Sequence, residues 1–177
     1  MVFMSCVGSE RVMRVCIYLG CGWDKQSSTA ETKWIHVDVR PSVNPDVVWD
    51  MEMFPYPFES ESADEVWLKN SLEHVSFHKV EGVIKEVCRI LRRGGRLFIM
   101  CPDMEVLAYK VILNPFRRWD FKYISYWVYG AQDYPENVHK SGFTKEALRV
   151  LLEGHGFRIV SMQNDKGTNI ICYAEKI

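Results

Sequence analysis

The stretch from Cys16 to Arg40, CIYLGCGWDKQSSTAETKWIHVDVR, places two apolar runs on either side of a glycine-containing turn. The first run stops at Gly20 and Gly22, and the second ends at Asp38. Glycines directly after a strand can adopt positive φ and let the backbone approach a ligand, although a G-x-G turn alone is weak evidence. A carboxylate about 16 to 18 residues beyond such a turn can accept two hydrogen bonds from a ribose diol. The stretch therefore predicts a strand, a ligand-binding turn and a second strand that ends in an acid.

The size of the chain favours a single domain, and its charge does not favour binding to a nucleic-acid duplex. It has 177 residues, of which 47% are hydrophobic, and a formal net charge of −1. This is near the size of an ordinary single domain and enough apolar material for a substantial core. The basic residues are spread along the sequence rather than clustered. A nucleic-acid partner is therefore unsupported.

The cysteines and the apolar runs indicate a reduced protein without a membrane segment. The six cysteines form no C-x-x-C pair and have no zinc-ligand spacing. No run approaches the roughly 18 apolar residues that a membrane span requires, and the first residues lack a signal-peptide pattern. We therefore expect a soluble, cytoplasmic protein.

Seven short runs rich in β-branched and aromatic residues predict seven strands. Several of these runs are apolar on both faces, which is typical of a mostly parallel sheet covered by helices. Three early connections are too short or too rich in Pro, Ser, Asp and Glu for regular crossover helices. We therefore predict an α/β fold whose front-half crossover helices are shortened or missing. The predicted strands lie near residues 14–19, 34–39, 46–49, 63–68, 96–101, 157–162 and 169–174, and the three connections near 23–33, 40–45 and 51–62.

Two helices are predicted in the second half of the chain. Apolar residues recur at three- and four-residue spacing from Val80 to Leu91, and Gly94 stands at the expected C-terminal stop. The second helix covers residues 144–153, with Thr144 as its N-cap. Between the fifth strand and this helix, an aromatic-rich insertion is expected at about 103–135. Its eight aromatic residues between 116 and 134 favour core and cover, with a substrate lid or a dimer surface as alternatives.

A third polar signal follows the third predicted strand, in VVWDMEMFPYPF at residues 47–58. Asp50 could accept a hydrogen bond from an exocyclic amine, and Met51 could flank a flat base. Taken alone, Asp50 is equally well explained as a turn cap. However, the glycine turn, Asp38 and Asp50 each follow one of three successive strands. Ligands bind at this edge of open α/β sheets, so the three signals together predict a ligand site.

Several segments, matched in order, resemble class I S-adenosylmethionine-dependent methyltransferases. The similarity is to a small, front-truncated bacterial and archaeal branch of the methyltransferase type 11-like superfamily. The resemblance implies a single Rossmann-like domain over residues 1–177, S-adenosyl-L-methionine as cofactor, and a small-molecule or glycan-type acceptor methylated on oxygen or nitrogen. The segments are YLGCG (18–22), HVDV (36–39), DVVWDMEMFPYPFESESADEVWLKNSLEHV (46–75), EVCRILRRGGRLFIMCPD (86–103) and GAQDYPENVHKSGFTKEALRVLLEGHGF (130–157).

The resemblance also implies which residues contact the cofactor. Following the chain, the contacts would be to the methionine moiety, then the ribose, then the adenine, and finally the amino-acid end. The implied residues are Gly20, Cys21, Gly22, Asp38, Val39, Asp50, Met51, Leu68, Lys69 and Asn70.

The sequence departs from the family pattern at two positions. The acid that commonly stands two positions before the first glycine is Tyr18 here, and the usual third glycine is Asp24. The first departure removes a carboxylate that helps to hold the cofactor's ammonium group, so Asp24 or a backbone carbonyl would have to substitute. The second fits the missing first helix, because that glycine normally eases helix packing.

Two histidines are candidates for a general base. Methyl transfer is an in-line displacement, so alignment is the main requirement and a base is needed only if the acceptor must lose a proton. His74 in SLEHV and His139 in PENVHKSGF are the candidates, because imidazole titrates near neutral pH. His36, His78 and His155 are expected to be structural or exposed. No histidine has useful spacing to a cysteine or carboxylate, so no metal site is predicted.

Two other functions remain as alternatives. The first alternative is a module that binds S-adenosylmethionine without catalysis and regulates or scaffolds a partner. It is motivated by the departures from the family pattern at Tyr18 and Asp24. A nicotinamide-binding Rossmann protein is disfavoured, because the full G-x-G-x-x-G motif would need glycine at Lys25. A homodimer is an open possibility.

Overall fold

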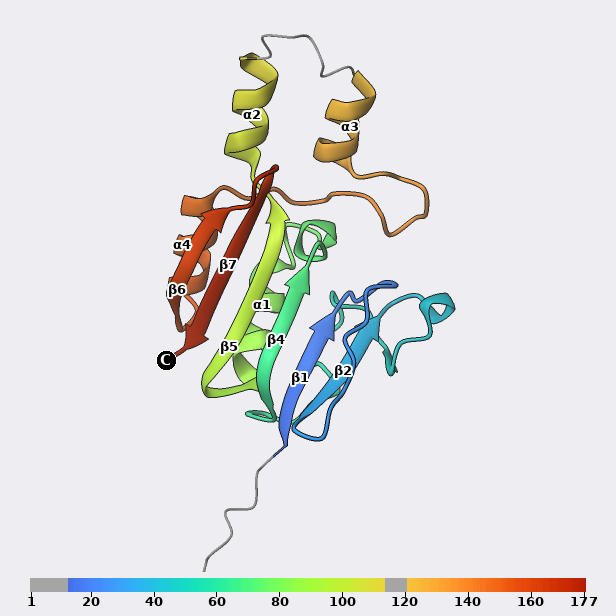
Figure 1. Ribbon diagram of the computed structural model, residues 1–177, viewed down its shortest axis with the longest axis vertical. Coiled ribbons are helices and arrows are strands. Elements are labelled where there is room, and N and C mark those ends of the chain that lie inside the picture. Colours follow the sequence, from blue (N-terminus) through green and yellow to red (C-terminus); the bar gives the residue numbers. More distant parts are fainter. Residues whose placement is uncertain (1–12, 114–120) are drawn as a thin grey trace, which may run out of the picture.

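The computed structural model describes residues 13–113 and 121–177, which form one seven-stranded sheet (Figure 1). The strand order is β3-β2-β1-β4-β5-β7-β6, and all neighbouring strands are parallel except for β7, which is antiparallel to β5 and β6. This arrangement confirms the predicted mostly parallel sheet. The strands are β1 (Arg14–Leu19), β2 (Thr32–Asp38), β3 (Val47–Val48), β4 (Ala63–Lys69), β5 (Leu91–Pro102), β6 (Phe157–Asn164) and β7 (Asn169–Lys176).

Both predicted helices are present, as α1 (Val80–Ile90) and α4 (Lys145–Glu153), and Figure 1 shows them on the same side of the sheet. Thr144 caps α4, because its hydroxyl oxygen accepts a hydrogen bond from the Ala147 backbone N–H at 3.1 Å. The predicted end of α1 is wrong. Leu91 is fully buried and pairs with Ala63 as the first residue of β5, so the helix ends at Ile90 and Gly94 lies within the following strand segment.

The aromatic-rich segment contains two helices that the sequence pattern did not predict, α2 (Met104–Ile112) and α3 (Phe121–Tyr129). Asp103 caps α2, and its carboxylate accepts from the Glu105 backbone N–H at 2.9 Å. Figure 1 shows both helices standing beyond the ends of β5 and β7 rather than against the sheet. Phe116 and Trp119, which belong to the predicted aromatic set, lie outside the described residues.

The front half of the chain lacks regular crossover helices, as predicted. Within residues 13–79, the helical segments are two short 3-10 turns, η1 (Pro41–Val43) and η2 (Leu72–His74). The second of these turns follows β4 and carries two residues of the site described below. Across the described ranges, no helix has the length and apolar character needed to cross a membrane.

The main core lies between the sheet and the two helices on its covered face. It is built from alternate residues of the central strands and from the apolar stripe of α1. Val83, Ile84 and Val87 of α1 are fully buried, as is Leu148 of α4. This packing fixes the central strands and thereby positions the loops at their carboxyl ends.

Candidate functional site

A pocket lies at the carboxyl ends of β1, β2, β3 and β4, and it encloses about 710 Å³ of space, part of it open to solvent. This is the edge at which open α/β sheets bind ligands. The pocket gathers residues from all three predicted signals, and also one predicted base. The predicted residues that line it are Gly20, Asp38, Val39, Asp50, Met51, Asn70 and His74. The predicted residues outside this lining are Cys21, Gly22, Leu68, Lys69 and His139.

The glycine turn is held tightly against its neighbours. Gly20 has φ of +70°, and a Cβ there would lie 2.6 Å from Cβ of Ser71, so a side chain at this position would be both strained and blocked. The Gly20 and Cys21 backbone N–H groups both donate to the Val37 carbonyl oxygen, at 2.8 and 3.0 Å. The turn after β1 is therefore fixed to β2 and leaves room for close approach at the pocket wall.

Asp38 joins the glycine turn to the chain that follows β2. It is buried, with one carboxylate oxygen accepting from the Gly22 N–H at 2.8 Å. The other oxygen accepts from the backbone N–H and Nε of Arg40, at 2.9 and 3.2 Å. The Arg40 guanidinium also lies 4.1 Å from the ring centroid of Tyr134. Asp38 thus organises one end of the pocket, and Arg40 connects it to the loop that follows α3.

The pocket residues after β3 are held by short local contacts. The Asp50 carboxylate accepts from the Glu52 N–H at 2.8 Å, which is the turn-capping contact considered from sequence. The Met51 carbonyl accepts from the Tyr56 hydroxyl at 3.0 Å. Both Asp50 and Met51 nevertheless line the pocket. The turn therefore places both residues at the pocket. The segment that follows it, which includes Tyr56, holds the turn in position.

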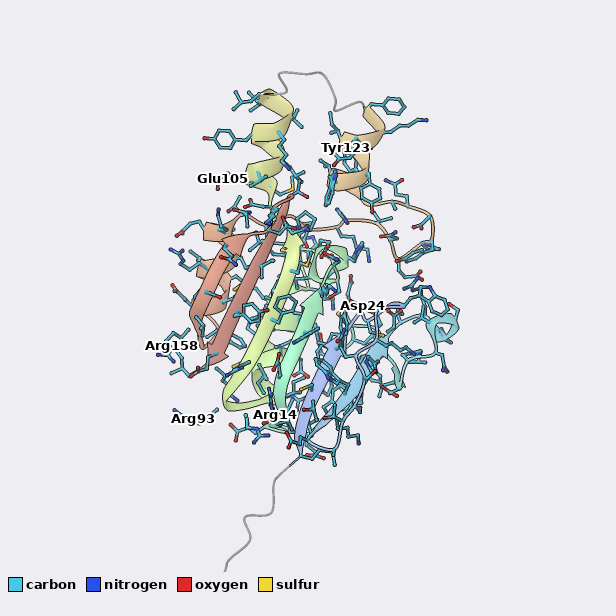
Figure 2. The ribbon with its side chains drawn as sticks, viewed as in Figure 1. Arg14, Asp24, Arg93, Glu105, Tyr123 and Arg158 are labelled. Atoms are coloured by element: carbon cyan, nitrogen blue, oxygen red, sulfur yellow. The ribbon has the colours of Figure 1, made fainter. Side chains whose placement is uncertain are left out.

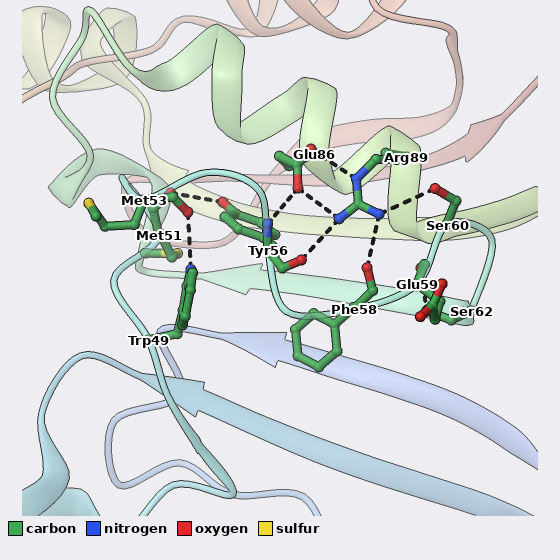
Figure 3. Close-up of polar contacts among 10 residues, drawn as sticks. All are labelled: Trp49, Met51, Met53, Tyr56, Phe58, Glu59, Ser60, Ser62, Glu86 and Arg89. Carbon is green, nitrogen blue, oxygen red and sulfur yellow. Dashed lines mark hydrogen bonds and ion pairs between the residues drawn. The ribbon is translucent and has the colours of Figure 1, made fainter.

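That supporting segment is hydrogen-bonded to an ion pair on α1 (Figure 3). Arg89 and Glu86 on α1 are paired at 2.8 Å. Arg89 also donates to the carbonyl oxygens of Tyr56 and Phe58, at 3.2 and 2.9 Å, while Glu86 accepts from the Tyr56 N–H at 2.7 Å. A segment without a helix of its own is in this way attached to the helix that packs on the sheet.

The three predicted residues at the exit of β4 lie in different environments, and Asn70 is the one that lines the pocket. The Leu68 side chain is fully buried in the core that faces the helices. Lys69 forms an ion pair of 2.6 Å with Asp24, which also lies 3.3 Å from the Tyr18 hydroxyl. Figure 2 shows Asp24 near the carboxyl-end edge of the sheet. Asp24 thus already holds one cationic side chain, which bears on whether it can replace the missing acid.

Glu73, His74 and His139 come together beside the pocket. One candidate ligand atom from each lies within 4.8 Å of the others, and the two imidazole ring centroids are 4.9 Å apart. Burial is the main cause that lowers the pKa of both imidazoles. Burial also raises the pKa of the Glu73 carboxyl to about 8, and its Oε2 atom is buried without a hydrogen-bond partner among the described residues. His74 faces the pocket, whereas His139 contacts the ring of His74.

The backbone holds this cluster in place. The Lys140 and Ser141 N–H groups donate to the Glu73 carbonyl oxygen, at 2.8 and 3.1 Å. The His139 N–H donates to the carbonyl of Tyr129 at 3.1 Å. This return of the chain needs Gly130, which has φ of +82° and where a Cβ would lie 2.5 Å from the Asn137 carbonyl oxygen.

Sequence reasoning missed several residues of the site. Arg40, Tyr134, Glu136 and Lys140 line the pocket, and Glu73 stands behind it. Within residues 130–143, part of a segment that resembles the family, sequence reasoning gives only His139 as a site candidate. The one local signal for Glu73 was its place beside His74 in SLEHV.

The comparisons with known proteins agree with the fold. Residues 17–99 match the methyltransferase domain family Methyltransf_11. No curated protein matches the chain.

Solved structures of similar fold include an S-adenosylmethionine-dependent methyltransferase from Methanosarcina mazei, with TM-score 0.66, 19% identity and 93% of each chain covered. Another, from Archaeoglobus fulgidus, has TM-score 0.63 and 15% identity, with 94% of this chain and 87% of that chain covered. The 1,6-didemethyltoxoflavin-N1-methyltransferase of Burkholderia thailandensis, solved with that molecule and S-adenosylhomocysteine, has TM-score 0.62 and 14% identity, with coverages of 93% and 71%. At these identities, the likeness establishes the fold.

Proposed function

We propose that the chain is an S-adenosylmethionine-dependent methyltransferase and that it methylates an oxygen or nitrogen atom of a small-molecule or glycan-type acceptor. The match of residues 17–99 to a methyltransferase domain family supports this proposal. The fold is the Rossmann-like fold of class I methyltransferases. The observation that carries the proposal is the pocket, in which residues from four successive strand ends meet at one edge of the sheet.

The pocket residues suit the cofactor's functional groups. We assign the backbone of Gly20 to the methionine moiety, Asp38 to the ribose hydroxyls, and Asp50 with Met51 to the adenine. Each carboxylate oxygen can accept more than one hydrogen bond, so Asp38 can bond to a ribose while it holds Gly22 and Arg40. The buried Ser71 hydroxyl lines the same pocket and has no hydrogen-bond partner among the described residues, which supports a polar ligand next to Gly20.

The chain's own part in the reaction is mainly alignment. S-adenosylmethionine, when bound, supplies an activated methyl group, and in-line transfer requires the acceptor atom to be held opposite the sulfur. Tyr134 and Lys140 come from the loop after α3 and line the pocket together with His74. In this proposal the loop forms one wall of the acceptor site. His74 and His139 are the candidate bases for the acceptor's proton when one must be removed.

The catalytically silent module remains a second candidate, because of one observation. Tyr18 replaces the usual acid, and its nearest substitute, Asp24, is already paired with Lys69. A weakly held amino-acid end would favour binding without turnover. Calorimetry with S-adenosylmethionine, followed by a methyl-transfer assay over a broad acceptor panel, separates the two functions. Binding without any transfer supports the module.

The cofactor site is tested by replacing Asp38. Asp38→Ala removes the proposed bonds to the ribose and is expected to weaken S-adenosylmethionine binding by about 1 to 3 kcal/mol. Isothermal titration measures the change, with circular dichroism to check the fold. Glu153→Ala, an exposed position at the end of α4, is the control and should bind as the parent chain does. An unchanged affinity in folded Asp38→Ala would remove Asp38 from the site.

The proposed base is tested by replacing His139. His139→Ala is expected to leave cofactor binding nearly intact and to reduce turnover by roughly 10²- to 10⁴-fold if this residue acts as a base. Before an acceptor is known, fragments soaked into crystals can locate the acceptor position. Fragments that bind far from the His74 side of the pocket would contradict this assignment.

A further inference from the structure

The cluster of Glu73, His74 and His139 has the composition of a metal site. It offers two imidazoles and one carboxylate, with candidate ligand atoms within 4.8 Å of one another. The first two residues are adjacent in η2, and the third arrives from the loop after α3, far later in the chain. This separation explains why sequence spacing predicted no metal site.

Both imidazoles are held through Nδ1 by a backbone carbonyl. Nδ1 of His74 lies 3.1 Å from the Val138 carbonyl oxygen, and Nδ1 of His139 lies 3.0 Å from that of Trp127. A carbonyl can only accept, so each Nδ1 carries the proton and each Nε2 keeps its lone pair. Histidines that bind metal ions commonly have their second nitrogen bonded to a backbone carbonyl in this way. Both rings are therefore oriented and in the tautomer that coordination requires.

The carboxylate independently points to a site that binds a cation. Glu73 is buried, and its Oε2 has no hydrogen-bond partner within residues 13–113 and 121–177. A buried and unpaired carboxylate oxygen is unfavourable, and buried carboxylates are usually paired with a cation or bound to a metal. The Lys140 and Ser141 backbones approach Glu73 through its carbonyl oxygen rather than its carboxylate. A cation bound by the Glu73 carboxylate and the two imidazoles would satisfy all three groups.

We propose that Glu73, His74 and His139 bind one divalent transition-metal ion, with Zn²⁺ as the ion to test first. Two imidazoles and a carboxylate suit Zn²⁺ better than Mg²⁺ or Ca²⁺, and three protein ligands leave a position open. Because His74 also lines the pocket, an oxygen atom of a bound molecule can complete the coordination. That this oxygen belongs to the methyl acceptor rests on the proposed function; the metal site itself does not. Two histidines bound to an ion would not be free to act as bases.

The test is metal binding by tag-free protein after treatment with a chelator. Zn²⁺ is titrated by calorimetry, and the bound metal is counted by elemental analysis. Glu73→Gln and His139→Ala each remove one ligand. His78→Ala removes an exposed histidine outside the cluster and is the control. We expect one equivalent of Zn²⁺ in the parent chain and in the control, and about a tenfold or greater loss of affinity in the two ligand variants.

Two further measurements check the type of ligand and the fold of the variants. The absorption spectrum with Co²⁺ should show nitrogen and oxygen coordination, and thiolate-to-cobalt charge transfer would instead assign the ion to cysteines and overturn the proposal. Equal Zn²⁺ affinity in all four proteins, or no binding by the parent chain, would also overturn it. S-adenosylmethionine binding is measured on the same variants, where retained affinity shows that they are folded. Zn²⁺ binding without S-adenosylmethionine binding would support the metal site and defeat the proposed function separately.

Discussion

The two faces of the sheet are built from different kinds of side chain. On the face that packs against α1 and α4, the central strands contribute buried aliphatic residues, namely Ile17, Leu19, Val66, Leu68, Leu97 and Ile99. On the opposite face, Tyr18, Trp67, Phe98 and Tyr173 lie in register across β1, β4, β5 and β7. Their successive ring centroids are 5.8, 5.1 and 4.9 Å apart. No helix among the described residues packs on this second face (Figure 1).

The cover of the second face is uneven: Tyr18 and Phe98 are buried, Trp67 is partly buried and Tyr173 is exposed. The connection between β1 and β2 protects its own strands, since the Gln26 N–H donates to Nε2 of His36 at 3.0 Å. The exposed fraction is 2% for Tyr18, 7% for Phe98 and 44% for Tyr173. Contacts between large rings can therefore cover a sheet face that has no helix packed on it, because aromatic side chains bury much area against one another. We therefore expect the helix-covered face to contribute more stability.

The largest loss is expected on the covered face. Leu97→Ala removes a fully buried side chain between the sheet and the helices, and should lower the free energy of unfolding by about 2 to 5 kcal/mol. Urea unfolding followed by circular dichroism measures it. Val160→Ala, an exposed aliphatic position on β6, is the control, and its effect should stay within about 0.5 kcal/mol. Similar losses in both variants would contradict the expectation that the helix-covered face contributes more stability.

The second-largest loss of stability is expected from the ion pair between Glu86 and Arg89 on α1. Arg89→Ala leaves the carbonyls of Tyr56 and Phe58 without their donor and Glu86 without its cationic partner. The free energy of unfolding should fall by about 2 kcal/mol. Arg93→Ala, an exposed residue labelled in Figure 2, controls for the loss of an arginine. If both arginine variants unfold at the same urea concentration, the ion pair contributes nothing measurable.

A smaller loss is expected at the open end of the aromatic row. Tyr173→Ala removes a ring that is nearly half exposed and contacts Phe98, and should lower the free energy of unfolding by about 1 kcal/mol. The same urea series measures it beside Leu97→Ala. A loss as large as that of Leu97→Ala would mean that the open face is as important as the covered one.

The smallest effect is expected from the pH dependence of the ion pair between Glu86 and Arg89. The hydrogen bond from Arg89 is the main cause that lowers the pKa of Glu86 below its ordinary value. Its contribution is therefore present above the unfolded-state pKa and is lost as the pH falls through the lower folded-state value. The stability difference between the parent chain and Glu86→Gln should shrink below about pH 4. A difference that grows on acidification would contradict this sign.

The strands and the three pocket signals were predictable because their patterns are local. Alternating or continuous apolar runs mark the strands, and a glycine turn or an acid at a strand end has meaning within a few residues. The helices α2 and α3 were missed, since their aromatic residues lie mostly exposed and follow no clear apolar stripe. Figure 2 shows Tyr123 projecting from α3, beyond the end of the sheet.

The rest of the site depends on contacts between distant segments. Arg40 meets Tyr134 and Glu73 meets His139 only after the loop following α3 has returned to η2. The burial of Glu73 could not be read from SLEHV, because a three-residue 3-10 turn carries no periodicity. The pairing of Asp24 with Lys69 likewise joins residues 45 positions apart.

The return at Gly130 has a consequence for redesign of the protein. The helices α2 and α3 project from the sheet, and the residues that flank them are fixed: Asp103 is fully buried, and Gly130 tolerates no Cβ. None of the described residues of α2 and α3 lines the pocket, so these helices can be exchanged without replacing a pocket residue. The carbonyls of Trp127 and Tyr129 hold His139, however, so they belong to the scaffold. A graft that preserves the site must therefore rejoin the parent chain before Trp127.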